Sequence, residues 1–210
     1  KYDGESQLVD DRKLDGIHFM LPTPFQSNGD VDLASFSRLV NAAKAAGCTG
    51  VVTLGVMGEA NRLTDTERGP IIDAVVAAVG DDLTVTVGAS AESGRALAQR
   101  VKDAQSSGAT AVMIAPAKLA KPNPLATFAY YSAAQEVTSV PIVVQDLPEQ
   151  TGVHLDPSFI AKLHTELPDA KYLKLEDPPT PQKVTRVVEA TVGSMGIFGG
   201  LGGAFLYEEL

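Results

Sequence analysis

Short apolar runs alternate with longer amphipathic stretches along almost the whole of this sequence. The apolar runs are continuous, which is typical of parallel strands that helices cover. The amphipathic stretches repeat with the period of a helix, and several of them end at a glycine. This pattern predicts strands at 16–21, 50–54, 83–87, 111–115, 141–144, 172–177 and 195–198. It predicts helices at 32–46, 64–79, 93–107, 125–138, 156–167 and 180–192, and a last helix that begins near 204.

The repeating unit is therefore one strand followed by one helix, and it occurs about seven times, the last barely begun. The fold class is α/β, and the arrangement we favour is a (β/α)₈ TIM barrel that is truncated after its seventh strand. An open parallel sheet is the alternative, but no Rossmann glycine fingerprint follows the first strand. We expect residues 1–15 to be an N-terminal extension and residues 16–210 to be one barrel domain, incomplete at its C-terminus.

Composition narrows the class of protein further. The net charge of −9 and the absence of a basic stripe argue against nucleic-acid binding. A single cysteine, Cys48, cannot form an internal disulfide and fits a reducing compartment. The histidines have no metal-site spacing, and no apolar run is long enough to span a membrane. We expect a cytoplasmic protein that binds neither nucleic acid, membrane nor metal.

Lys174 is the strongest candidate for chemistry. It lies in YLKLED at 172–177, a strand that ends in charge. If Leu173 and Leu175 face the helices, Lys174 faces the interior, because strand side chains alternate. Burial disfavours the charged form of an amine and makes it nucleophilic toward carbonyl groups. Alternatively, Lys174 only forms an ion pair with Glu176 or Asp177.

Other strand ends of a barrel would converge on the same side as this lysine. The turn GVMGE at 55–59 could offer the amides of Val56 and Met57 to a carboxylate, or it could simply be a tight turn. Gln145 and Asp146 end the fifth strand, where Asp146 could instead brace a loop. The glycines that begin at Gly199 lie where barrels often bind phosphate, although close packing explains them equally well.

Several of these motifs together resemble the dihydrodipicolinate synthase/N-acetylneuraminate lyase family. GVMGE at 55–59 resembles its GTTGE turn, and LPEQTG at 147–152 resembles its V-P-x-R-T-G segment. Lys174 stands where that family has its Schiff-base lysine, and PTPF at 22–25 fits as well. The resemblance runs from about residue 16 to the end of the chain. It implies a (β/α)₈ barrel that binds pyruvate or another 2-oxo acid as an imine, needs no cofactor, and forms a homodimer or homotetramer.

The sequence departs from that family at residues that relay protons and bind substrate. Val56 and Met57 replace the two threonines of the turn, Gln145 replaces the usual tyrosine, and Gln150 replaces the arginine. None of these side chains titrates near neutral pH. Asp146, Glu176 or water would have to take over proton transfer.

Two functions follow. The first is a class I lyase or aldolase, similar to 4-hydroxy-tetrahydrodipicolinate synthase, in which Lys174 forms a Schiff base with a 2-oxo acid. The second is an altered relative that binds a small carboxylic acid or serves as an assembly subunit. The predicted catalytic residues are Lys174, Gln145 and Asp146. The predicted substrate-binding residues are Val56, Met57, Gly58, Gln150 and Gly199.

Overall fold

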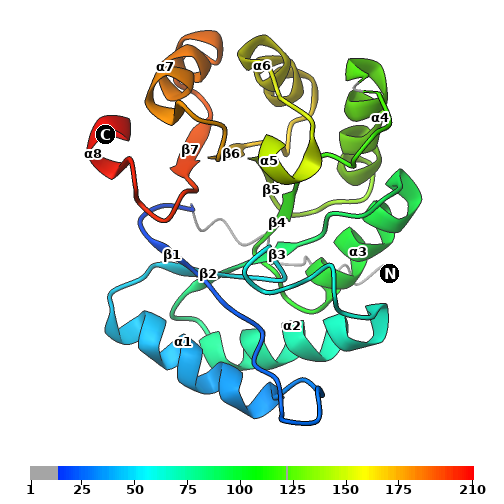
Figure 1. The fold of residues 1–210 in the computed structure, drawn as a ribbon, viewed down its shortest axis with the longest axis vertical. Coiled ribbons are helices and arrows are strands. Elements are labelled where there is room, and N and C mark those ends of the chain that lie inside the picture. The colour runs from blue at the N-terminus through cyan, green and yellow to red at the C-terminus, as the bar shows by residue number, and fades with distance from the viewer. Residues whose placement is uncertain (1–13, 122) are drawn as a thin grey trace, which may run out of the picture.

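The computed structural model describes residues 14–121 and 123–210. Seven strands form a single parallel sheet, in which each strand pairs with its neighbours in the chain (Figure 1). The strands are β1 His18–Met20, β2 Gly50–Thr53, β3 Thr84–Gly88, β4 Ala111–Ile114, β5 Ile142–Asp146, β6 Tyr172–Leu175 and β7 Gly196–Gly199. The helices are η1 Leu33–Ser35, α1 Phe36–Ala45, α2 Asp65–Val79, α3 Gly94–Ser106, α4 Pro124–Gln135, α5 Pro148–Thr151, α6 Pro157–Glu166, α7 Thr180–Ala190 and α8 Leu206–Glu209.

The sheet curls at the centre of the molecule, and the helices lie around its outside (Figure 1). A doubly wound open sheet would reverse its strand order part of the way across, whereas this sheet keeps the order of the chain throughout. The structure therefore confirms the predicted α/β fold, a curled parallel sheet that matches a TIM barrel truncated after its seventh strand. Within the described residues, β1 and β7 are the two free edges.

Alternation along the strands divides the core into two layers. One face of each strand carries residues such as Val87, Val144 and Leu173, which join the large cluster that packs beneath the helices. The opposite face supplies a smaller cluster inside the curl, which includes Met113 and Tyr172. Both faces are apolar because both are buried, which explains the continuous apolar runs.

The helix boundaries follow the expected local signals with two differences. Thr64 begins α2 through a capping box, in which its amide donates to Glu67 Oε2 at 2.7 Å. Asp32, by contrast, caps the short 3-10 helix η1, and α1 begins only after it. The four-residue helix α5 was not predicted, because one turn is too short to show a helical period.

The predicted N-terminal extension lies mostly outside the described residues, which begin at Leu14. Leu14 itself is buried in the inner cluster, and its amide donates to the Tyr172 hydroxyl at 3.1 Å. The last residues of the predicted extension therefore contact the barrel interior. In the part of the chain that the structure describes, no helix combines the length and apolarity needed to cross a bilayer. The described residues also contain no cluster of three or more potential metal ligands.

Candidate active site

Lys174 lies on the inner face of β6, near the carboxyl end of the strand. The strand register places it beside Gln145 of β5 and Phe198 of β7. Leu173 and Leu175 point outward into the large core cluster, as alternation requires. The side chain of Lys174 is only 12% exposed, so the amine is held largely away from water.

Three polar side chains form a connected group here, which we call the lysine cluster: Lys174, Glu176 and Gln145. Lys174 Nζ lies 2.9 Å from Glu176 Oε1. Gln145 Nε2 donates to the other carboxylate oxygen, Glu176 Oε2, at 2.7 Å. Both oxygens of a buried carboxylate are thus occupied, one by the cation and one by a neutral amide. Hydrogen bonds that involve an ion in such a dry setting are short and strong.

Gly200 leaves the space that this cluster needs. A Cβ added at Gly200 would overlap Glu176 Cγ and would lie 2.9 Å from Lys174 Cε. The chain after β7 therefore approaches the lysine cluster so closely that a side chain does not fit. Gly199, the glycine of this run that was predicted to bind substrate, lies against a different group: a Cβ there would overlap the carboxylate of Glu209 in α8.

The turn after β2 exposes backbone amides near the same edge of the sheet. The Gly58 amide donates to the Gly55 carbonyl at 3.1 Å, and Thr23 Oγ1 donates to the Gly58 carbonyl at 2.6 Å. These bonds hold the turn in place. Within residues 14–121 and 123–210, the amides of Val56 and Met57 donate to no acceptor. Two free adjacent amides are suited to a carboxylate.

A cavity of about 730 Å³ opens at the carboxyl ends of β2 to β5. Three predicted site residues line it: Val56, Gln145 and Gln150. Gln145 also donates to Glu176, so this amide connects the cavity wall to Lys174 through the Glu176 carboxylate. The cavity is large enough for a small organic acid.

Sequence reasoning missed Arg68, which also lines this cavity. Its guanidinium donates to the Gly88 carbonyl at 2.6 Å and to the Ala60 carbonyl at 3.4 Å. Burial, and then the charge of nearby Arg100, lowers the pKa of Arg68 to about 10. Arg68 therefore connects the end of β3 to Ala60, which directly follows the turn at 55–59. The available signal was its position on the apolar face of α2, one turn before Ile72.

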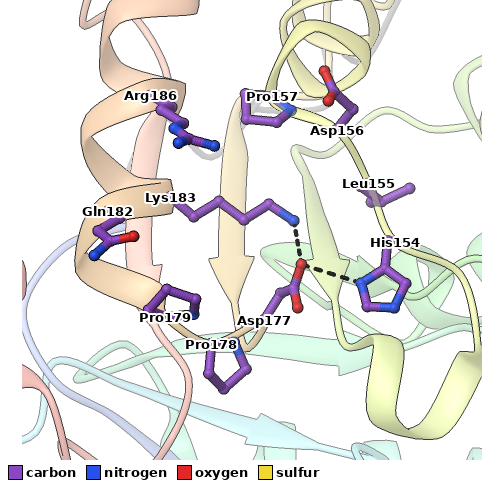
Figure 2. Close-up of a pocket in the computed structure, with 10 residues that line it drawn as sticks. All are labelled: His154, Leu155, Asp156, Pro157, Asp177, Pro178, Pro179, Gln182, Lys183 and Arg186. Carbon is purple, nitrogen blue, oxygen red and sulfur yellow. Dashed lines mark hydrogen bonds and ion pairs between the residues drawn. The ribbon is translucent and has the colours of Figure 1, made fainter.

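Asp146 does not join the lysine cluster. It follows Gln145 in β5 and therefore faces outward, where its Oδ2 lies 2.6 Å from Lys183 Nζ of α7. Lys183 Nζ also lies 2.7 Å from Asp177 Oδ2, which is 3.4 Å from His154 Nδ1. Figure 2 shows Lys183 and His154 converging on Asp177 from opposite sides. The predicted part of Asp146 in proton transfer at Lys174 thus has no geometric support.

Asp177, Lys183 and His154 line a second cavity of about 300 Å³ beside the first turns of α6 and α7 (Figure 2), whereas Asp146 is not part of its lining. Burial raises the pKa of Asp146, although Lys183 opposes this shift. Burial also acts to raise the pKa of Asp177, but Lys183 and His154 together outweigh it, and the pKa is lowered. The group is a buried ion-pair network that fixes α7 to β5.

Taken together, a curled parallel sheet with helices outside it, and a largely buried lysine at the end of its sixth strand, define a (β/α) barrel with a candidate active site at the carboxyl ends of its strands. The chain belongs to the dihydrodipicolinate synthetase family, whose family model matches residues 13–206.

Two relatives illustrate the match in sequence. The 4-hydroxy-tetrahydrodipicolinate synthase of Mycobacterium leprae (strain Br4923) is 33% identical over 141 residues, which cover 67% of this chain and 47% of that protein. The protein with this name from Thermotoga sp. (strain RQ2) is 30% identical over 176 residues, or 84% of this chain and 59% of that protein. The chain thus spans about half to three fifths of the length of these relatives.

Solved structures of the family share the fold. Dihydrodipicolinate synthase from Thermotoga maritima has a TM-score of 0.85 at 28% identity, with 92% of this chain and 66% of that chain covered. A monomeric dihydrodipicolinate synthase variant has a TM-score of 0.85 at 27% identity, with 93% of this chain and 65% of that chain covered.

Proposed function

We propose that this protein is a class I lyase or aldolase that acts on pyruvate or another 2-oxo acid through a Schiff base on Lys174. The observation that carries the proposal is the position of this amine. It is largely buried, it faces the interior of the barrel, and it lies at the carboxyl end of a strand. Barrel enzymes place their catalytic groups at that end. The names of the relatives, 4-hydroxy-tetrahydrodipicolinate synthases, support the same reaction class.

In the proposed reaction the amine of Lys174 adds to the C2 carbonyl of the acid, and water leaves. The protonated imine then accepts an electron pair when a bond at C3 breaks. The substrate carboxylate binds to the amides of Val56 and Met57, next to Gly58. Gln150 contacts the end of the substrate opposite its carboxylate. Gly199 contributes to substrate binding on the β7 side of the lysine cluster.

A second function has specific support. Val56, Met57, Gln145 and Gln150 supply no titrating group, so the pocket could bind a small carboxylic acid without turning it over. An altered relative of this kind could also serve as a subunit of an assembly. For either function we propose a cytoplasmic protein, in line with its single cysteine. We also propose a homodimer or homotetramer, which is what the resemblance to the family implies.

Reduction with borohydride separates the two functions. The full chain is incubated with pyruvate and other 2-oxo acids, reduced, and measured by intact mass and peptide mapping. We expect one stable adduct, on Lys174. Lys174→Arg should abolish it, whereas Lys171→Arg, at an exposed lysine of the same segment, should leave it unchanged. If the folded protein gives no adduct with any of these acids but binds them by calorimetry, the binding function replaces the lyase.

A further inference from the structure

The lysine cluster contains one carboxylate, Glu176, to which the proposed function assigns no role. Lys174 Nζ contacts Glu176 Oε1, and no other carboxylate among the described residues lies within ion-pair distance of this amine. Asp146 and Asp177 are both held by Lys183 on the outer side of the sheet. Glu176 is therefore the carboxylate that the fold places at this nitrogen.

The tyrosine hydroxyls of the described residues do not compete for this position. The hydroxyls of Tyr130 and Tyr131 donate to backbone carbonyls that lie outside the lysine cluster. Tyr172 accepts the Leu14 amide near the start of β6, away from the end that carries the lysine. Tyr207 is 94% exposed on α8. The four tyrosines that the structure describes are thus engaged elsewhere or lie in solvent.

The orientation of Glu176 is fixed by two neighbours. Gln145 Nε2 holds Oε2 at 2.7 Å, which leaves Oε1 directed at the amine. Gly200 packs against the Glu176 side chain so closely that no Cβ would fit between them. The Glu176 side chain is 9% exposed, so its carboxylate has little freedom to turn toward water. A group held in this way is preorganised for proton transfer.

We infer that Glu176 is the catalytic acid–base residue of the Schiff-base reaction, with Gln145 as its positioning residue. The inference rests on the proposed function. Glu176 first accepts a proton from the Lys174 ammonium, the neutral amine adds to C2 of the acid, and one proton of the new N–C bond's nitrogen moves to the former carbonyl oxygen. Glu176 returns the proton to the hydroxyl of the resulting carbinolamine, which leaves as water. The imine is then protonated, and Glu176 is a carboxylate again.

The same carboxylate accepts a proton from C3. The C3–H bond breaks, its electron pair forms the C2–C3 double bond of the enamine, and the electrons of the C=N bond return to nitrogen. The proton is then on Glu176, which can give it back or exchange it with solvent. This step restricts the substrate class to 2-oxo acids that carry at least one hydrogen at C3. It also explains how the chain can lack titrating groups at Val56 and Gln145 and still move protons.

The test measures C3 proton exchange and imine formation on the same samples. Pyruvate is incubated with the full chain in deuterated water, and the loss of its methyl proton signal is followed by NMR. The amount of imine is measured by borohydride trapping after equilibration. Glu176→Gln keeps the shape of the side chain but cannot accept a proton. We expect its exchange rate per trapped adduct to fall at least about 100-fold, the usual contribution of a general base.

Two further variants keep the result decisive. Glu189→Gln makes the same change at an exposed position on α7 and should exchange as the wild type does. Gln145→Met leaves Glu176 in place without its anchor, so exchange per adduct should fall while the pyruvate concentration for half-maximal trapping stays the same. If Glu176→Gln does not fold, as judged by circular dichroism, Gln145→Met decides the question.

The outcomes separate this inference from the function on which it rests. If the wild type forms the Lys174 adduct and Glu176→Gln exchanges within about threefold of it, Glu176 is not the base, although the lyase stands. If Gln145→Met, used in its place, exchanges at the wild-type rate, the inference is equally overturned. If the wild type forms no adduct, the proposed function fails, and the role of Glu176 fails with it.

Discussion

Replacing Lys183 with methionine should destabilise the protein strongly, because it leaves two carboxylates without their shared cation. Asp146 Oδ2 and Asp177 Oδ2 lie 2.6 and 2.7 Å from Lys183 Nζ, so the two carboxylates share a single ammonium. Asp146 is fully buried, and the side chains of Lys183 and Asp177 are 12% and 17% exposed. Methionine fills a similar volume, so the loss of charge dominates over the loss of packing.

The expected loss is about 3 kcal/mol of unfolding free energy at neutral pH. Removing one partner of a buried ion pair typically costs about 3–5 kcal/mol, because the remaining charge is left without compensation. We place this site at the lower end of the range because Asp177 reaches solvent and also contacts His154. Lys162→Met is the matched control, since Lys162 is 45% exposed and its pair with Glu166 spans 4.0 Å. Such a surface pair contributes at most about 1 kcal/mol.

The stability loss caused by Lys183→Met should depend on pH, because the substitution changes the pKa of Asp146. In the wild type, burial already raises the pKa of Asp146 above its ordinary value of 3.8. Removing Lys183 takes away the main influence that opposes burial and therefore raises that pKa further. The folded variant then holds more protons than the unfolded chain, so its stability falls as the pH rises through the window between 3.8 and the raised pKa. The deficit relative to the wild type should therefore shrink on acidification, because protonated carboxyls need no cation.

Urea denaturation followed by circular dichroism at pH 7 and at about pH 5 measures both effects. The double variant Asp146→Asn/Lys183→Met should recover part of the loss at neutral pH, since it removes the most deeply buried charge. A loss below about 1 kcal/mol at neutral pH, or a deficit that grows on acidification, would refute the assignment of this group as a buried ion-pair network that stabilises the fold.

Two substitutions probe the backbone around the site. Gly200→Ala should displace Glu176 and the neighbouring lysine, because the added methyl overlaps Glu176 Cγ. We expect borohydride trapping to slow at least about tenfold, while the thermal transition shifts little. Trapping at the wild-type rate would show that the cluster tolerates the contact. Arg68→Met should cost about 2 kcal/mol in urea denaturation, through the lost bonds to the Gly88 and Ala60 carbonyls, and should raise the pyruvate concentration needed for half-maximal trapping. An unchanged pyruvate concentration would show that Arg68 does not support substrate binding at the turn of residues 55–59.

Most of the architecture followed from local pattern. Continuous apolar runs between amphipathic helices predicted a parallel sheet with helices outside it, and the ordered sheet from β1 to β7 confirmed this. The pattern succeeded because the side-chain periods of strands and helices differ, and burial on both faces removes polar residues from a strand. One turn of helix, α5, escaped because four residues are too few to show a period.

Within one strand, the sequence predicted which site residues lie on the same face. It did not predict which residues of neighbouring strands face each other. Alternation placed Lys174 on the inner face and made Glu176, two residues later, a neighbour on the same side. Alternation could not say whether Gln145 or Asp146 faces the lysine, because both stand at the end of the fifth strand. That choice depends on which face of the strand is turned inward, and a shift of one residue exchanges the two faces.

The sequence by itself determined the alternation of elements, the inward lysine and the places where strands end, since each depends on residues close together in the chain. Only the tertiary structure decided that Gln145 anchors Glu176, that Asp146 turns outward to Lys183, and that Gly200 leaves room for the lysine cluster. These contacts join residues that lie far apart in the chain. They are fixed by strand register and helix packing, which arise from burying the whole core at once.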